Sequence, residues 1–584
     1  MICDVVFDLP LRRAFSYAVR PGLKLARGQR VRAALQGRAR VGIVVALREG
    51  DEHGLKPVDG AVEPVPILSA ATLELCRWAA AESLSSWGST MLSLLPPPPR
   101  ARAAEPVAPA PEPQPASPTA PELWTGASRE ARLIEELESS QDATLLIAPD
   151  RDTAGRWAER LDAARLDSGA SASARRAAWF AASRGRARIV AGTRSALLVP
   201  LPPPAKLVLL DEHDPAHKPP GPPRLHSRDL LLRRAALEGN RLLLLSATPS
   251  AETWWRAQSG HVARRDGGAA AWPAVVSADT RGILRHHPVT PVLGRAIADA
   301  ARAGRRTVLI VMRAASALAC DDCGVLLRCP DCAVPLARAP GALRCRLCGR
   351  SEPLPTRCPG CGGHHLSLFG WDAERVEAAV HRRFPRLTIS RKDRGAQVLI
   401  GPATVLKGRA SGSLGCVGVI ALDALLRVPD FRASERALEL LWAAAEAVGA
   451  AGRVVVQTLH PEHEAIRAAR DQDLAGFFEH ELKLRLELGY PPFRRLCLVS
   501  ARSRSAPEAQ ALLEECGAAL RGIPGLIVYP PAPLSGAGTH AGRWRFLIKG
   551  PEELPRLISQ PLGPFVERRR RLGGMVEVEM DPLE

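Results

Sequence analysis

The chain has 584 residues, enough for several domains that each bury a core of their own. Its 79 Lys and Arg against 61 Asp and Glu leave a formal net charge of +18 at pH 7, which favours an anionic partner such as nucleic acid. No apolar run approaches the roughly 20 residues that span a bilayer, and the start, MICDVVFDLPLRR, lacks a secretory signal. These features argue against a membrane protein and predict a cytoplasmic one.

The amino-terminal part, residues 1–95, has the alternation and turns of a small β-rich unit. We expect strands near 31–35 and 40–47, followed by a helical stretch from 71 to 95. Residues 96–121 are dominated by Pro, Ala and Glu, a composition that predicts an extended linker.

Beyond the linker, short apolar strands that end in polar residues alternate with helices, which predicts parallel sheets covered on both faces. A first α/β lobe is expected over 122–285, with strands at 144–149, 188–193, 206–211 and 241–248. A second lobe is expected over 286–319 and 364–470, with strands at 307–312, 397–401, 417–422 and 453–458. The remaining residues, 471–584, predict a separate α+β domain.

Eight of the thirteen cysteines form four Cys-x-x-Cys pairs in an insert, 320–363, within the second lobe. Two residues between thiolates let both sulfurs bind one ion, and two such pairs complete a closed tetrahedral zinc site. The insert is loop-like and poor in large apolar residues, so metal would have to supply its core. Disulfides are the alternative, disfavoured by the spacing and by the missing signal. We therefore expect two structural zinc ions per chain.

The spacing between the pairs suggests a nested arrangement. Twelve residues separate the second and third pairs, an ordinary spacing for a zinc ribbon, which leaves the outer pairs to hold the other ion at the base of the insert. One zinc ion is then assigned to Cys320, Cys323, Cys358 and Cys361, and the other to Cys329, Cys332, Cys345 and Cys348.

Independent motifs in the same order resemble the PriA family of primosomal replication-restart helicases over nearly the whole chain. The internal matches are IVAGTRSALLVP (189–200), LLSATPSAETW (244–254), the eight cysteines, PDFRASER (429–436) and VVVQTLHPEHEAI (454–466). Residues 8–35 resemble that family's DNA 3′-end-binding domain, and GYPPF with RWRFLIK resembles its C-terminal domain. The resemblance implies two RecA-like lobes, recognition of stalled forks, and loading of the replicative helicase or its loader through primosome partners.

The phosphate-binding loop of the implied motor is degenerate. Such a loop needs Gly-rich backbone, a Lys that reaches the phosphates and a Ser or Thr on Mg²⁺. The corresponding stretch, Thr125-Gly126-Ala127-Ser128-Arg129-Glu130, is short, and the chain has no lysine between Lys56 and Lys206. We expect Thr125, Gly126 and Arg129 to form an ordinary start of a helix, which puts ATP binding in doubt.

Two further motor elements are incomplete. The acidic motif is Asp211, Glu212, His213 and Asp214, one acid short of the family's motif, whose acids hold Mg²⁺ and orient water. These residues are either remnants of that site or solvated residues at a strand end. No base occurs in 443–451, where the resemblance implies an arginine finger. Together the losses predict no ATP hydrolysis and no helicase activity.

The DNA contacts implied by the resemblance depend on other residues. The family places an acid between two aromatic residues to accept a bond from a 3′ hydroxyl, whereas Phe15-Ser16-Tyr17 has a serine, a weaker acceptor. Phe15 and Tyr17 are otherwise one buried and one exposed strand position. Candidate phosphate contacts are Arg194, Arg432 and Arg436, and at the amino end Arg12, Arg13, Arg27, Arg30, Arg32, Arg38 and Arg40. The alternative for each arginine is a solvated face.

The sequence leaves three functions open. The leading hypothesis is a zinc-stabilised, DNA-binding scaffold that recognises forked or junction DNA and recruits primosome proteins without unwinding. The first alternative is an active ATP-dependent 3′-to-5′ helicase with a divergent phosphate site, and the second is a protein-docking role alone. Nucleotide binding separates the first two, and salt-dependent binding of fork DNA separates both from the third.

Overall fold

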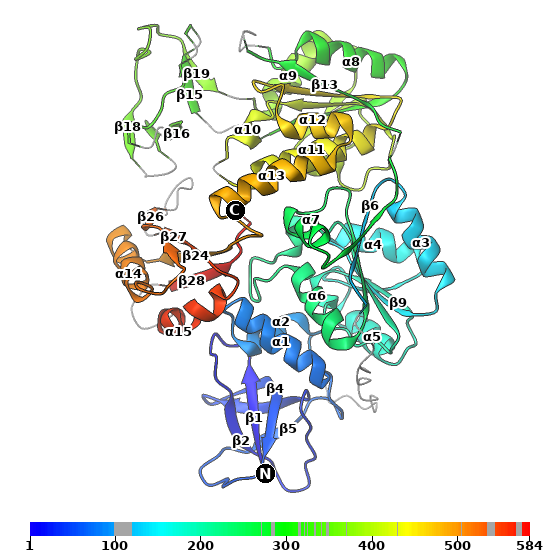
Figure 1. Ribbon diagram of the computed structural model, residues 1–584, viewed down its shortest axis with the longest axis vertical. Helices are drawn as coiled ribbons and strands as arrows, with labels where there is room; N and C mark the ends of the chain where they lie inside the picture. Colours follow the sequence, from blue (N-terminus) through cyan, green and yellow to red (C-terminus); the bar gives the residue numbers. More distant parts are fainter. Residues whose placement is uncertain are drawn as a thin grey trace.

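The computed structural model contains five sheets arranged as two central lobes with smaller units around them (Figure 1). The residues that it describes are 1–98, 119–269, 271–281, 287–312, 317–320, 322–323, 325–331, 335–339, 341–345, 350–369, 371–428, 430–503, 505–533, 543–567 and 575–583. Most of the expected linker, 96–121, lies outside them. Within the described part of the chain, no helix is long and apolar enough to cross a membrane.

The N-terminal unit is a five-stranded antiparallel sheet of order β2-β1-β4-β3-β5 with two helices. Its elements are β1 (Ile2–Phe7), β2 (Phe15–Ala18), β3 (Arg30–Leu35), β4 (Arg38–Arg48), β5 (Val58–Ala61), α1 (Ala70–Glu82) and α2 (Trp87–Leu94). The helical stretch expected from 71 to 95 is present as two helices with a break between them. Leu84 has a positive φ of 52°, and the Ser86 side chain accepts a bond from the Ser89 amide as the N-cap of α2, because serine favours caps over helix interiors.

The first lobe is a seven-stranded sheet of order β12-β6-β11-β10-β7-β9-β8, in which all recorded pairs are parallel. Its strands are β6 (Glu122–Thr125), β7 (Ala143–Ile147), β8 (Ala164–Leu166), β9 (Ile189–Gly192), β10 (Ala205–Leu209), β11 (Arg241–Leu245) and β12 (Ala263–Asp266). Its helices are α3 (Arg129–Ser139), α4 (Arg151–Arg160), α5 (Ala172–Ser183), α6 (Ser227–Glu238) and α7 (Ala251–Gln258), with single turns η1 (Arg194–Ala196) and η2 (Pro215–His217). Buried apolar clusters cover both faces, as a parallel sheet requires.

The second lobe is a parallel six-stranded sheet of order β13-β23-β22-β14-β21-β20. Its strands are β13 (Ala274–Asp279), β14 (Arg306–Val311), β20 (Ile389–Ser390), β21 (Val398–Gly401), β22 (Leu414–Ile420) and β23 (Arg453–Thr458). Its helices are α8 (Pro291–Arg302), α9 (Ala373–Arg383), α10 (Asp423–Leu426), α11 (Ala433–Val448), α12 (Glu464–Asp471) and α13 (Leu474–Leu488), with the turn η3 (Ala403–Leu406). Both sheets match the expected α/β class with two RecA-like lobes.

Two boundaries of the second lobe differ from those expected from the sequence. Strand β13 lies before residue 286, yet it pairs along its length with β23 and extends this sheet. Helix α13 lies beyond residue 471, yet Phe477, Phe478 and Leu482 are buried in the core of the same lobe. Both segments were assigned to neighbouring units because a strand partner or helix partner distant in sequence leaves no local signal.

The cysteine insert is a small antiparallel sheet of order β18-β17-β16-β15-β19. Its strands are β15 (Ala317–Cys320), β16 (Ala337–Ala339), β17 (Ala342–Arg344), β18 (Ser351–Pro353) and β19 (Leu366–Phe369). Leu318, Leu327, Leu336 and Leu343 pack with Cys329 and Cys345 in a cluster of their own. The expectation of a loop-like segment is therefore wrong, because single leucines spaced along short strands meet on one face.

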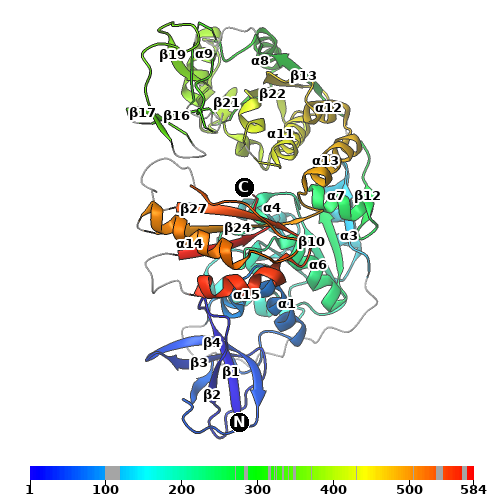
Figure 2. The same ribbon diagram turned by 60° about the vertical axis from the view of Figure 1, so that its left-hand side comes forward.

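The C-terminal domain combines a sheet of order β25-β27-β24-β28, with β26 paired to β27, and two helices. Its elements are β24 (Arg495–Arg502), β25 (Ile527–Val528), β26 (Ala532–Pro533), β27 (Arg543–Gly550), β28 (Met575–Met580), α14 (Ala506–Ala519) and α15 (Leu554–Glu567). Helix α15 packs beside α1 of the N-terminal unit, as both ribbon views show (Figures 1 and 2). Leu84, between α1 and α2, is buried in the C-terminal core, so the N-terminal unit and the C-terminal domain contact each other.

Candidate functional site

The loop between β6 and α3, where the resemblance implies a phosphate cradle, is filled by neighbouring backbone. Gly126 has a φ of +82°, and a Cβ there would come within 2.7 Å of the Gly267 nitrogen. The Ala127 amide donates to the Gly268 carbonyl at 3.0 Å, and the Ser128 hydroxyl donates to the Gly267 carbonyl at 2.8 Å. The amide that would face a phosphate is therefore already bonded within the chain.

Arg129, at the position implied for the phosphate-binding lysine, forms a two-bond ion pair across the lobes. Its guanidinium donates to both carboxylate oxygens of Glu446 on α11, at 2.8 and 3.0 Å, and also to the Gly126 carbonyl. Burial alone would lower the pKa of Arg129, but the Glu446 carboxylate outweighs it and raises that pKa. The Glu446 carboxylate thus lies in α11, where the resemblance implies an arginine finger.

The acidic motif at the end of β10 is not solvated, so that alternative is wrong for Glu212. The Glu212 side chain is fully buried and accepts bonds from Arg228, from the hydroxyl groups of Ser250 and Thr253, and from the Ser250 amide. Burial would raise the pKa of Glu212, but Arg228 and the two hydroxyl groups together lower it. Its acceptor capacity is used to hold α6 and α7 against the strand.

The other members of the motif also have partners. Asp214 pairs with Lys407, which follows η3 of the second lobe. The ring Nδ1 of His213 lies 2.7 Å from the Ser246 hydroxyl. Asp211 adopts a positive φ of 48° and is partly exposed. Asp214 thus connects the first lobe to the second, whereas Glu212 and His213 bond to residues of the first lobe itself.

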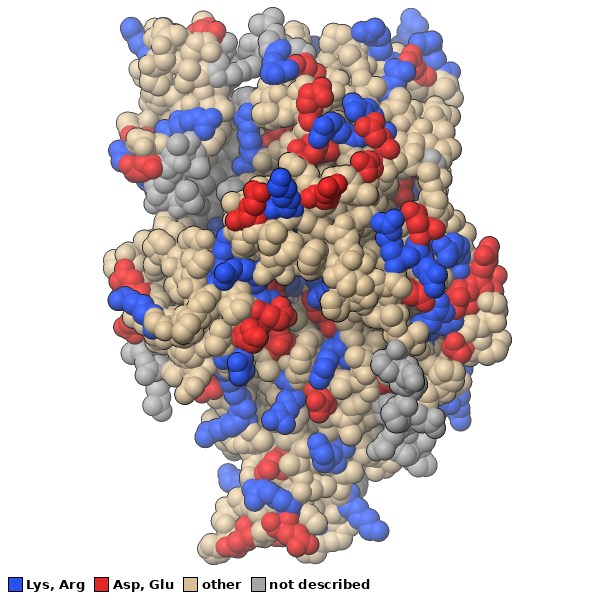
Figure 3. All heavy atoms as spheres, in the orientation of Figure 1, with Lys and Arg blue, Asp and Glu red and all other residues tan. Residues whose placement is uncertain are grey.

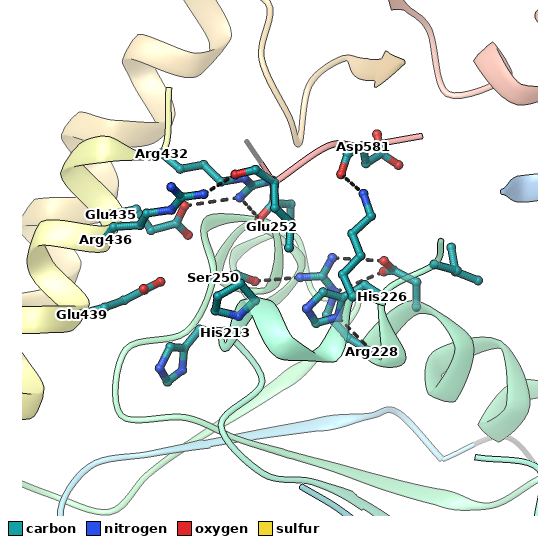
Figure 4. A pocket seen from close by; sticks show the side chains of 15 residues that line it. His213, His226, Arg228, Ser250, Glu252, Arg432, Glu435, Arg436, Glu439 and Asp581 are labelled. Carbon is teal, nitrogen blue, oxygen red and sulfur yellow. Dashed lines mark hydrogen bonds and ion pairs between the residues drawn. The ribbon is translucent and has the colours of Figure 1, made fainter. Parts of the chain in front are cut away.

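Arg432 and Arg436 line a pocket between the lobes and the end of the chain (Figure 4). Arg432 is buried, 8% exposed, and donates to both oxygens of Glu252 at 2.6 and 3.1 Å. Arg436 pairs with Asp430 at 2.9 Å and donates to the Leu583 carbonyl. The expectation that Arg432 offers its charge to DNA is not met by this structure, because that charge is neutralised by a buried carboxylate.

Arg194 begins the turn η1 after β9. One guanidinium nitrogen is buried without a hydrogen-bond partner in the described part of the chain, and burial lowers the pKa of Arg194. The side chain is thus only partly accessible.

The outer cysteine pairs come together at the base of the insert. The sulfurs of Cys320, Cys323, Cys358 and Cys361 all lie within 4.8 Å of one another. Two of the sulfur-to-sulfur distances, from Cys320 to Cys361 and from Cys323 to Cys358, are 3.6 Å. Zinc–sulfur bonds of about 2.3 Å in a tetrahedron separate sulfurs by about 3.8 Å, so this cluster fits a zinc ion.

The inner pairs can be followed only in part. Cys329 and Cys345 are buried in the insert's apolar cluster, while Cys332 and Cys348 lie outside the described residues. A second ion at the inner pairs therefore stays a prediction.

Ser16 in the N-terminal sheet lies beside a carboxylate that the sequence analysis missed. Asp4 of β1 is directly opposite Ser16 of β2, and its carboxylate accepts the Ser16 hydroxyl bond at 2.7 Å. Arg48 donates to both residues, at 3.3 Å to Asp4 and 3.2 Å to Ser16. The register of β1 against β2 therefore places the Asp4 carboxylate beside residue 16, although residue 16 itself is a serine.

The two aromatic residues that flank Ser16 differ in burial. Tyr17 is buried and donates its hydroxyl to the Ala34 carbonyl. The Phe15 ring is partly exposed, with its edge against Phe7 and the Arg13 guanidinium 5.3 Å from its centroid. Phe15 is the aromatic side chain that a ligand on this edge strand can reach.

The candidate arginines at the amino end fall into two groups. Arg30 is buried in an ion pair with Glu63, Arg12 donates to Ser559 of α15, and Arg27 donates to the Val45 carbonyl. Arg32, Arg38 and Arg40 on the β3–β4 hairpin are exposed, and within the described part of the chain their side chains have no hydrogen bond or ion pair. Basic and acidic side chains are mixed over the face of the molecule shown in Figure 3.

Family models match both ends of the chain. One, described as a 3′ DNA-binding domain of PriA, matches residues 4–96, and another, described as the primosomal protein N C-terminal domain, matches residues 486–583.

Several replication restart proteins named PriA are similar in sequence. That of Treponema pallidum is 27% identical over 99% of this chain and 99% of its own length. That of Bacillus subtilis is 27% identical over 71% of this chain and 56% of its own length, and that of Chlamydia pneumoniae is 32% identical over 54% and 47%. The chain thus spans about half the length of several relatives that it matches. A solved structure of RecG bound to a three-way DNA junction covers 62% of this chain and 44% of its own at 11% identity, with a TM-score of 0.35.

Two parallel-sheet lobes, an N-terminal unit that matches a 3′ DNA-binding domain, and a four-cysteine cluster that could hold a metal ion define a multidomain α/β protein of the DNA-binding class. Over nearly its whole length the chain is similar to the PriA family of replication restart proteins, and both of its ends match models of PriA domains.

Proposed function

We propose that this chain binds DNA at stalled replication forks and promotes primosome assembly and loading of the replicative helicase, without unwinding DNA itself. The observation that carries the proposal is the N-terminal unit, which matches a 3′ DNA-binding domain and presents three unpaired arginines on one hairpin. Unpaired guanidinium groups on an exposed hairpin are suited to phosphate contact, which positions a protein on DNA.

The absence of a motor is supported by the cleft between the lobes. The loop that would cradle phosphates is packed against 266–268, and Arg129 is neutralised by Glu446. Transition-state stabilisation of phosphoryl transfer needs cations that are free to meet the phosphate oxygens. We therefore infer that fork recognition in this chain is separate from ATP hydrolysis.

Zinc is the metal that the cysteine clusters suit, and we propose two ions per chain. The sulfurs of the outer pairs would hold one ion and join the two ends of the insert, and the inner pairs would hold the other. A site with four thiolates is closed, so the metal would stabilise the fold and leave no position for a substrate. Primosome proteins, among them the replicative helicase or its loader, are the proposed partners, and the cytoplasm is the proposed compartment.

The proposed end recognition involves Asp4. A DNA 3′ end offers a hydroxyl donor next to a phosphate, and the Asp4 carboxylate with the Arg48 guanidinium beside it supplies an acceptor and a cation. Asp4, 21% exposed, would thus provide from the neighbouring strand the acid that Ser16 lacks.

Replacing Arg32, Arg38 and Arg40 together by Ala is expected to weaken binding to fork DNA and to reduce its salt dependence. Each lost phosphate contact lowers the slope of log affinity against log salt by about 0.9 on duplex DNA, so the slope should fall by about 2 to 3. Fluorescence anisotropy with labelled forks over a salt series measures both quantities.

A matched variant removes the same charge elsewhere. Arg295, Arg382 and Arg386 are exposed on the second lobe, and their replacement by Ala should leave the slope near that of the unmodified protein. Equal slopes for the two triple variants would refute the hairpin as the DNA contact.

In the same assay, Asp4→Asn should abolish any preference for a 3′ hydroxyl over a 3′ phosphate while keeping the slope of log affinity against log salt.

A further inference from the structure

Ion pairs cross from the first lobe to the second at three places. They join Arg129 at the start of α3 to Glu446, Asp214 after β10 to Lys407, and Glu252 on α7 to both Arg432 and Arg485. All seven charges therefore belong to the contact between the lobes and leave few cations there for another anion.

The Arg129–Glu446 pair has the geometry of a bound anion. Two parallel bonds at 2.8 and 3.0 Å join the guanidinium and carboxylate, the arrangement with which arginine also holds phosphate. The side chains are 12% and 27% exposed, so water screens the pair little. The Glu446 carboxylate, which α11 contributes, therefore occupies the place beside Arg129 that a bound phosphate would take.

The contact around α7 is fixed by charge and by packing. The amide of Ala251 donates to Glu435 of α11 at 2.7 Å, and Arg485 of α13 donates to the same carboxylate at 2.7 Å. The Trp254 and Phe478 rings stack at 4.8 Å. Because these groups are buried, separating the lobes would leave several charges without partners.

We propose that the lobes are held closed by these internal ion pairs, with the Glu446 carboxylate acting as a built-in anion for Arg129. In a nucleotide-driven motor, a phosphate between two lobes favours closure and its release allows opening. Here closure needs no nucleotide, so the lobes form a fixed platform beside the N-terminal and C-terminal domains. This conformational device extends the proposed function, but it rests on the contacts between the lobes alone.

The ion pair between Arg129 and Glu446, called the latch from here on, is tested by reversing each of its two charges singly and then exchanging them. Glu446→Arg places two guanidinium groups together, and Arg129→Glu places two carboxylates together, so each single variant should open the lobes. Hydrogen exchange of amides in 126–130 and 443–449 should be at least tenfold faster in both single variants. The double variant R129E/E446R should return these rates to within about threefold of the original, because the pair is restored in reverse.

A matched exchange distinguishes the latch from general charge effects. Asp299 and Arg302 are 50% and 78% exposed and form a pair within the second lobe, and their reversals should leave exchange in 126–130 and 443–449 unchanged. Small-angle scattering should give a larger radius of gyration for the single latch variants and the original value for the double variant. Addition of ATP should change neither quantity in the unmodified protein.

The proposal would be overturned if the single charge reversals kept slow hydrogen exchange in these segments. It would also be overturned if amides in the double variant exchanged as fast as in either single variant. If a single variant unfolds altogether, the double variant still decides, since restored folding supports the latch and continued unfolding contradicts it. Loss of fork binding with an intact latch would instead count against the proposed function.

Discussion

Replacing Cys320 and Cys358 by Ser is expected to lower the zinc content from two ions to one per chain and to unfold the base of the insert. These are the two buried sulfurs of the outer cluster, while Cys323 and Cys361 are exposed. Serine cannot supply the thiolate that zinc requires. The small cluster around Leu318 and Leu343 is too limited to hold the insert closed without the metal. Mass spectrometry of metals and limited proteolysis of 320–363 measure the two effects.

A core cysteine outside the insert provides the control. Cys76→Ala removes a buried thiol of α1 and should keep two zinc ions and an uncleaved insert. Fewer than two tightly bound ions in the unmodified protein would contradict the proposed stoichiometry. A cysteine double variant that retained both ions would contradict the assignment of the outer pairs to one site.

Glu212→Gln is expected to lower the free energy of unfolding of the first lobe by about 3 kcal/mol. Removing one charge of a buried ion pair leaves the other charge uncompensated, at a cost of about 3 to 5 kcal/mol, and Arg228 keeps Asp229 as a partner. The lower end of that range is therefore expected. Urea unfolding followed by tryptophan fluorescence measures the change, and fork binding should stay the same.

The pH dependence gives a second readout of Glu212. Its pKa is lowered in the folded protein from an ordinary value of 4.5, so its contribution is present above pH 4.5 and is lost as the pH falls through the folded pKa. Stability of Glu212→Gln should thus vary less below pH 4.5 than that of the original. As control, Glu130→Gln, at the exposed acid of the Arg160 pair, should stay within about 0.5 kcal/mol. An equal loss in both variants would show that Glu212 has no special role.

Local patterns in the sequence predicted the architecture of the lobes well. The runs near 206–211 and 453–458 are strands β10 and β23, because continuous apolar stretches must be buried on both faces of a parallel sheet. The cysteine spacing likewise predicted that the sulfurs of the outer pairs come together. The strands depend on residues that are close in the sequence, and the cysteine cluster depends on metal ligands of a single type.

Contacts between distant residues account for what was missed. Glu446 is one of three acids in the Ala-rich helix α11, and its partner is 317 positions away, so the sequence shows the loss of a base but not the ion pair that an acid makes there. Asp4 was overlooked because its relation to Ser16 depends on strand register. Arg432 was assigned to DNA because charge alone does not reveal Glu252 beside it.

The central claim, that this chain binds fork DNA without an ATP-driven motor, is tested most directly by calorimetric titration of the zinc-replete protein with ATP and Mg²⁺, with and without saturating fork DNA. We expect tight binding of the fork, no saturable heat on adding ATP, and no phosphate release in either sample. Saturable ATP binding accompanied by phosphate release that rises with fork DNA would contradict the account.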